Sequence, residues 1–141
     1  MLPVGRYRMK EHTADLALEV EGESPADLFA SAAAGFYRAI VQEPPRRGAE
    51  RHEVSCRGAD REELLVRFLS ELLYLYATRG FLAAAIEIRD CSEQALEAHL
   101  IGERFDPARH TILREIKAIT HHGLRVERAA QGWSATVIMD V

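Results

Sequence analysis

Two aspartates at the ends of predicted strands are the residues whose type and position most clearly indicate chemistry. Asp15 begins a predicted strand near the start of the 141-residue chain, and Asp140 ends the last one, one residue before Val141. If these strands are antiparallel neighbours, the two carboxylates and the terminal carboxyl or carbonyl group of Val141 converge. Such an all-oxygen cluster suits a hard cation such as Ca²⁺ or Mg²⁺. From spacing alone, the alternative is that Asp15 forms a turn and Asp140 is solvated.

Other polar residues near these positions carry weaker signals. Glu11 and His12 precede Asp15, and His12 could be either a structural or a functional histidine. His121 and His122 lie at a predicted turn, and no histidine or cysteine pair has the spacing of zinc ligands. Lys117 lies between apolar neighbours and projects to the opposite side of its strand. We expect it at the surface, with an ion pair to the acidic cluster or a partner contact as alternatives.

Composition and missing motifs exclude several classes of function. The chain has neither a P-loop nor a GxGxxG motif, so we expect it to bind no nucleotide. A net charge of −4 with scattered basic residues is atypical of a protein that binds RNA phosphates directly. Glu103 and Asp106 form a second acidic pair, for which a solvated loop is the favoured interpretation. There is no apolar run of about 18 residues and no signal peptide, which predicts a cytoplasmic protein without membrane contact.

Hydrophobic periodicity predicts two main helices. Ser24 and Pro25 are typical of a helix start, and apolar residues then recur every three or four positions until a stop before Pro44. Asp60 opens a second helix with Glu63 as the capping-box partner, and Gly80 ends it.

The remaining periodic segments predict strands. They are Tyr7–Lys10, Asp15–Glu21, His52–Cys56, Ala84–Arg89, Ala95–Ile101, Glu115–Thr120, Leu124–Arg128 and Trp133–Asp140. His122-Gly123 and Gln131-Gly132 are interpreted as hairpin turns, since glycine tolerates positive φ. The expected fold is α+β: a single two-layer domain, residues 1–141, in which two main helices pack on a mostly antiparallel sheet.

Several segments, in this order and together spanning nearly the whole chain, resemble the archease family. The resemblance rests on Tyr7–Asp15 (YRMKEHTAD), Val20–Ser24, Leu64–Tyr76 (LLVRFLSELLYLY), Gly102-Glu103 with Asp106 and His110, Glu115–Leu124 (EIKAITHHGL) and Gly132–Val141. Position 121 is His, where the family pattern has an aromatic residue.

The resemblance implies a function as a non-catalytic protein cofactor. Archeases are accessory proteins of the RtcB-type tRNA-splicing ligase, which seals RNA ends through a guanylate adduct on its own histidine, using GTP and a divalent metal. The family promotes that guanylylation and repeated turnover. The resemblance also implies a calcium-like site at Asp15, Asp140 and Val141, and a role for Lys117 in activation. Glu11 and His12 are further candidates for partner contact, and any contact with RNA is expected to be indirect.

Two other functions stay open from the sequence. One is a chaperone-like modulator of RNA-modification enzymes, which exposed apolar surface would favour. The other is a small metal-dependent hydrolase, in which Asp15 and Asp140 would activate water. The hydrolase would need a substrate pocket with a base, and the sequence identifies no convincing one.

Overall fold

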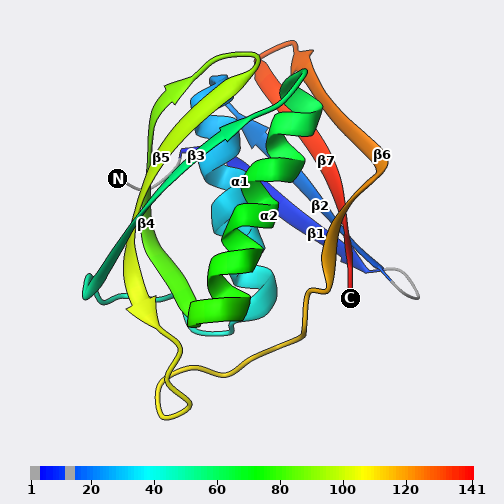
Figure 1. The fold of residues 1–141 in the computed structure, drawn as a ribbon. Helices are drawn as coiled ribbons and strands as arrows, with labels where there is room; N and C mark the ends of the chain where they lie inside the picture. The colour runs from blue at the N-terminus through cyan, green and yellow to red at the C-terminus, as the bar shows by residue number, and fades with distance from the viewer. Residues whose placement is uncertain (1–3, 12–14) are drawn as a thin grey trace.

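The computed structural model describes residues 4–11 and 15–141, with the side chains of residues 10 and 11 left out. This part of the chain contains seven strands and two helices (Figure 1). Their order is β1 (Arg6–Glu11), β2 (Asp15–Gly22), α1 (Pro25–Ile40), β3 (Glu50–Arg57), α2 (Arg61–Arg79), β4 (Phe81–Cys91), β5 (Ala95–Arg104), β6 (Ala118–Ala129) and β7 (Gly132–Asp140).

The strands form two antiparallel sheets. One sheet has the strand order β1-β2-β7-β6 and the other the order β3-β5-β4. Every pairing between these strands is antiparallel. The α+β class, the two helices and the antiparallel pairing are therefore confirmed.

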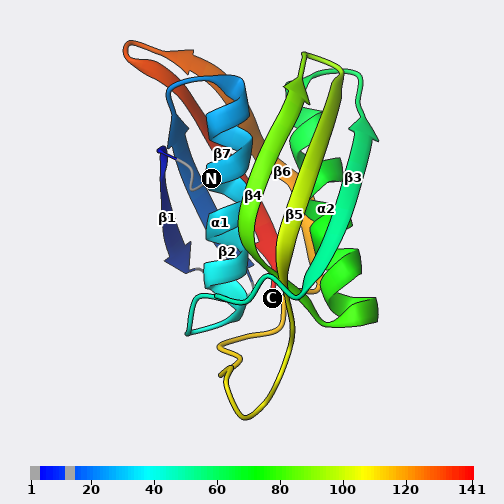
Figure 2. The ribbon, with the colours of Figure 1, turned by 90° about the vertical axis from the view of Figure 1, so that its left-hand side faces the viewer.

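The expected single sheet with helices on one face is replaced by two sheets with the helices between them (Figures 1 and 2). α1 contacts β2 of the first sheet and β4 of the second, and α2 contacts β6 and β3. A helix between two sheets must bury most of its circumference, and α1 does so, with 11 of its 16 residues buried. Small residues permit this: a Cβ at Gly35 would lie 2.7 Å from the Leu18 side chain of β2.

Local sequence signals fix both helix ends. The Ser24 hydroxyl accepts a hydrogen bond from the N–H of Asp27, and Pro25 occupies the first turn of α1. The Asp60 carboxylate accepts one from the N–H of Glu63 at the start of α2. Gly80 ends α2 at φ 68°, a left-handed conformation that favours glycine. Neither helix in the described part of the chain is long and apolar enough to cross a membrane.

The hairpin turn predicted at His122-Gly123 is wrong. β6 continues through both residues, and its pairing with β7 is interrupted by a register shift between Thr120 and Arg125 and then resumes. Gly123 does have a positive φ of 60°, but it serves a bulge within one strand rather than a reversal of the chain. The turn predicted at Gln131-Gly132 is confirmed, because it joins β6 to β7.

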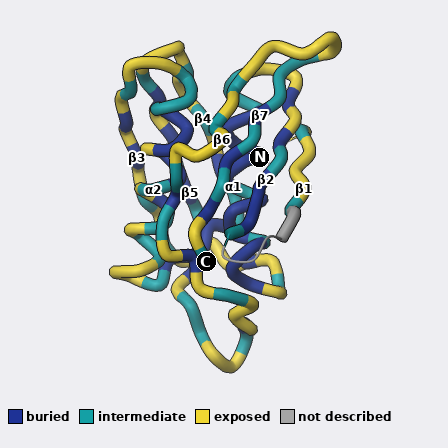
Figure 3. Tube along the Cα trace, turned by 90° about the vertical axis from the view of Figure 1, so that its right-hand side faces the viewer, coloured by how far each residue is buried: buried dark blue, intermediate teal, exposed yellow. Residues whose placement is uncertain are grey.

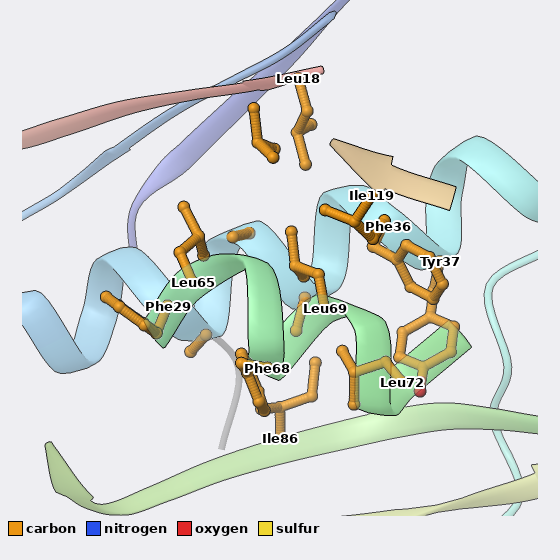
Figure 4. Packing of buried hydrophobic residues seen from close by; sticks show 14 of the residues in the cluster. Leu18, Phe29, Phe36, Tyr37, Leu65, Phe68, Leu69, Leu72, Ile86 and Ile119 are labelled. Atoms are coloured by element: carbon orange, nitrogen blue, oxygen red, sulfur yellow. The ribbon is translucent and has the colours of Figure 1, made fainter. Parts of the chain in front are cut away.

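The buried apolar residues form one cluster centred on the helices. Phe29 and Phe36 of α1 and Phe68 of α2 are fully buried. In Figure 4 the helices lie between Leu18 of β2 on one side and Ile86 of β4 on the other. Exposed residues follow the outer faces of the strands and the loops (Figure 3). This core holds the start of β2 and the end of β7 in place, and the candidate site lies where these two strand ends meet.

Candidate metal site and the neighbouring loops

The sheet register places Asp15 and Asp140 opposite each other. β2 and β7 are antiparallel neighbours, and Asp15 is the direct partner of Asp140 in the ladder. Directly opposed residues have Cβ atoms about 4.5–5.5 Å apart, within the range that one ion could bridge. The convergence expected from the sequence is thus confirmed for the backbone. That a cation binds there stays a prediction.

The environment of the Asp15 carboxylate fits a cation. Its Oδ1 is buried and accepts no hydrogen bond from the described residues. A buried acceptor without a partner costs about 1–3 kcal/mol, and a carboxylate costs more. Asp140 is exposed, and Val141, half-buried, follows it at the end of β7. Two carboxylates beside main-chain oxygens make an all-oxygen donor set of the kind that Ca²⁺ takes.

Within the described residues, no group of three or more histidine, cysteine, aspartate or glutamate side chains could hold a metal. The two aspartates therefore need further donors, such as main-chain oxygens, water or a partner. Of the other sequence candidates, His12 lies outside the described residues. Glu11 pairs with Leu16 through its backbone, and its side chain is not among those described.

Lys117 is brought to the same end of the sheet. Its N–H donates a 2.7 Å hydrogen bond to the carbonyl oxygen of Asp140, and the next residue, Ala118, pairs with Asp140 in the ladder. The Lys117 side chain is exposed, as the sequence predicted. It forms no ion pair with any described residue, so its charge faces outward beside the two aspartates.

A second acidic centre is built around Glu103, where the sequence had predicted a solvated loop. Glu103 is only 3% exposed. One carboxylate oxygen accepts from Arg109 at 2.6 Å and lies 3.1 Å from Nε2 of His110. The other accepts from the backbone N–H groups of Arg46 and Arg47, both at 2.8 Å. These four contacts use the acceptor capacity of a carboxylate completely.

Neighbouring contacts orient the partners of Glu103. Arg109 also donates to Asp106 at 2.6 Å, and Nδ1 of His110 accepts from the N–H of Asp106. Because Nδ1 is the acceptor, the proton on Nε2 faces Glu103. Burial raises the pKa of Glu103, but the hydrogen bonds from Arg109, Arg47 and Arg46 outweigh it and lower the pKa to about 2.

Sequence reasoning missed this centre for a specific reason. Glu103 lies at the end of β5 on the side that faces two loops, and strand periodicity does not show that loops cover it. The available signal was chemical: the chain places basic residues at 46 and 47 and again at 109 and 110. A carboxylate at a strand end with that many possible donors is a candidate for burial.

A hollow of about 900 Å³ lies elsewhere, between β3, α2 and His121. Cys56 lies in its wall, and burial raises the pKa of that thiol to about 11. A thiol with so high a pKa is a poor nucleophile at neutral pH. Neither Asp15 nor Asp140 lines this hollow.

Fold and site together define a class: a two-helix, two-sheet α+β protein with two paired aspartates at one sheet end, one of which has a buried oxygen without a donor among the described residues. Residues 7–141 match the model of the archease protein family, and the chain therefore belongs to the archease family. A protein archease of Archaeoglobus fulgidus is 40% identical over 96% of this chain and 99% of its own length. One of Methanosarcina mazei is 33% identical over 96% of both chains.

Two solved structures share the fold. The solution structure of protein 1598 of Methanobacterium thermoautotrophicum superposes with a TM-score of 0.81 at 24% identity, covering 96% of this chain and 98% of that one. The crystal structure of a Thermotoga maritima archease, described as a possible chaperone, gives a TM-score of 0.61 at 24% identity, covering 95% and 96%. At this identity the likeness shows the fold alone.

Proposed function

We propose that this chain is a non-catalytic protein cofactor of an RtcB-type RNA ligase. It promotes the GTP-dependent guanylylation of the ligase and its repeated turnover, in tRNA splicing or RNA repair. The observation that carries the proposal is the pairing of Asp15 with Asp140, with one buried carboxylate oxygen unpartnered, in a chain of the archease family.

The proposed cofactor is a divalent cation, Ca²⁺ or another hard ion, held by Asp15, Asp140 and a main-chain oxygen of Val141. When bound, the cation neutralises the two carboxylates and offers its open coordination positions to a partner. Asp15 supplies the buried anchor and the exposed Asp140 the side from which a partner approaches. The supporting observation is the difference in burial between these two carboxylates.

Lys117 is the proposed activation residue on this chain. Its main chain is tied to Asp140, and its exposed side chain carries a positive charge beside the cation site. That position suits contact with a carboxylate or phosphate in the ligase active site. Glu11 and His12 precede Asp15 in sequence and are proposed as further contacts at this end.

A chaperone-like role is the second candidate, because the Thermotoga maritima relative is described as a possible chaperone. A broad exposed apolar surface would support such a role. The large hydrophobic residues exposed on the described surface are spread over several elements: Val4, Tyr7, Tyr74, Ile112 and Leu113. This scatter favours a single specific partner. We place the protein in the cytoplasm, where it contacts RNA only through the ligase and binds no nucleotide itself.

The test is multiple-turnover RNA ligation by the organism's own RtcB-type ligase, with GTP and Mn²⁺, with and without this protein. We expect a large rise in turnover that is lost in Asp15→Asn and Asp140→Asn. Glu97→Gln is the matched control, because Glu97 is an exposed carboxylate on β5. Full turnover with an Asp140 variant that still binds the cation normally would contradict the proposed role of Asp140, and full turnover with a variant that no longer binds the cation would contradict the cation's role. No effect of the wild-type protein on turnover or guanylate formation would contradict the proposed function.

A further inference from the structure

Residues 111–114, which we call the strap, are hydrogen-bonded to the C-terminal end of α1 and to the loop that follows it. The N–H of Leu113 donates to the carbonyl of Ile40 at 2.7 Å, and the Arg114 side chain donates to the carbonyl of Ala39. The carbonyl of Thr111 accepts from the N–H of Gln42. Carbonyls at a helix C-terminus lack partners within the helix, so the strap satisfies them and is held by them.

Two carboxylates tie the same region to residues 41–47. Glu43 accepts from the N–H of Thr111 at 2.6 Å and from its hydroxyl at 2.9 Å, and the backbone bond contributes most to lowering the pKa of Glu43. Glu103 joins the backbone of Arg46 and Arg47 to Arg109 and His110, as described above. Residues 41–47 and residues 109–114 are therefore joined into one unit, which lies at the end of the molecule where the chain ends at Val141 (Figure 2).

This scaffold leaves particular side chains free. Ile112 is 38% and Leu113 46% exposed, although their backbone is fixed by the bridge to Val41 and the bond to Ile40. The side chains of Arg46 and Arg47 are exposed and form no ion pair with any described residue, although their N–H groups are fixed on Glu103. A hollow of about 420 Å³ lies between the loops, lined by both arginines.

The combination indicates a protein rather than RNA as the occupant. The buried core of a protein interface is apolar and arginines are enriched at such interfaces, and fixing these residues in advance lowers the entropy cost of binding. An RNA backbone would have to approach a protein of net charge −4 close to the exposed Glu115, which follows the strap in the chain. Carboxylates on a protein partner could instead pair individually with the two arginines.

We propose that Arg46, Arg47, Ile112 and Leu113 form a docking surface for a protein that presents an apolar patch bordered by carboxylates. The inference rests on the proposed function: the docked partner is the ligase, and docking brings the Asp15–Asp140 end of the chain onto the ligase. The docking surface supplies affinity for the ligase, whereas the aspartate pair holds the cation. Mutations can therefore change ligase affinity and cation binding separately.

The structure permits variants that preserve the scaffold, because the residues to be replaced contribute only backbone groups to the contacts that hold residues 41–47 and the strap. The docking variants are Ile112→Ser with Leu113→Ser, and Arg46→Glu with Arg47→Glu. The apolar control is Tyr74→Ser, since Tyr74 is 62% exposed on α2. The charge control is Arg6→Glu with Arg57→Glu, because both arginines are exposed where β1 begins and β3 ends, away from the loops (Figure 2).

The experiment measures the Kd of the purified ligase for each full-length variant, beside Ca²⁺ affinity as a check on folding and on the cation site. We expect each docking variant to bind the ligase at least about tenfold more weakly and each control within about twofold, with Ca²⁺ affinity retained in all. Raised salt should weaken the wild type and the apolar variant, but scarcely the Arg46→Glu, Arg47→Glu variant.

Three outcomes would overturn the inference. If the wild type binds and activates the ligase and the docking variants bind within about twofold of it, the surface is wrong and the proposed function stands. If the wild type neither binds nor activates the ligase, the proposed function fails and the inference fails with it. If the wild type binds a single-stranded RNA oligonucleotide through Arg46 and Arg47 more tightly than the ligase, the surface is an RNA site.

Discussion

The two acidic centres at one end of the molecule differ in how their charge is balanced. Glu103 is 3% exposed and its carboxylate is fully satisfied by donors from its own chain. The Asp15–Asp140 pair has a buried oxygen without a donor among the described residues. A carboxylate neutralised from within holds the fold together, whereas one left open is suited to an ion or partner from outside. The difference favours a structural role for Glu103 and supports the proposed cation site at the aspartate pair.

The largest expected effect on stability is at Glu103. Replacing it by Ala removes the acceptor of four contacts, and it leaves Arg109 without its counter-charge and the Nε2–H of His110 without its acceptor. Breaking a buried ion pair by removing one partner costs about 3–5 kcal/mol, so we expect a loss near the lower value in the free energy of unfolding. Urea denaturation measures it.

The control for Glu103→Ala is Glu97→Ala, on the exposed side of the same strand, β5. An exposed carboxylate away from special contacts should change stability by less than about 0.5 kcal/mol. If the two variants unfolded at the same urea concentration, the structural role of Glu103 would be refuted.

At the aspartate pair, unlike at Glu103, the free energy of unfolding should depend on an added cation. At a free Ca²⁺ concentration of about 100 times Kd, the wild type should gain about 2.7 kcal/mol. Asp15→Asn should gain little from Ca²⁺, and without Ca²⁺ it should unfold no more readily than the wild type, because the amide removes a charge whose buried oxygen has no donor among the described residues. Thermal unfolding with Ca²⁺ and with a chelator provides the comparison. A large loss of stability in Asp15→Asn without the cation would give the pair a structural role instead.

Lowering the pH should remove the stabilisation that the Glu103 carboxylate contributes. The pKa of Glu103 is about 2 in the folded chain and about 4.5 when unperturbed, so the unfolded state takes up the proton first. The stabilisation is therefore complete above about pH 4.5 and is lost as the pH falls toward 2. The stability difference between wild type and Glu103→Gln should shrink over that window. A constant difference from pH 6 to pH 2.5 would contradict the depressed pKa.

Lys117 should show the smallest effect on stability. Its structural contact is made by the backbone, so Lys117→Ala should change the free energy of unfolding by less than about 0.5 kcal/mol. Ligase activation should nevertheless fall, and Lys117→Arg should restore part of it. Unfolding curves and turnover assays on the same preparations separate these two readouts. Unchanged activation in Lys117→Ala would remove the residue from the proposed mechanism.

Features determined by nearby residues could be predicted from the sequence. The caps at Ser24, Asp60 and Gly80 each depend on neighbours within a few positions, and the structure confirms all three helix ends. The Asp15–Asp140 pairing was also accessible, because it follows from the alternation within two strands once they are assumed to be neighbours.

Features that depend on distant parts of the chain were not predictable in this way. A glycine with positive φ fits a hairpin turn and a bulge equally well, and only the pairing of β6 with β7 decides between them at Gly123. The burial of Glu103 depends on two loops about 57 and 6 residues away along the chain. Two sheets rather than one follow from which strands pair, and periodicity does not specify pairing.

The measurement that tests the central claim most directly is calorimetric titration of Ca²⁺ into the wild type, Asp15→Asn, Asp140→Asn and Glu97→Gln. The account predicts one cation per chain in the wild type and in Glu97→Gln, and at least about tenfold weaker binding in both aspartate variants. Binding of equal strength in Asp15→Asn, or no binding by the wild type of Ca²⁺, Mg²⁺ or Mn²⁺, would contradict the assignment of the aspartate pair as a cation site.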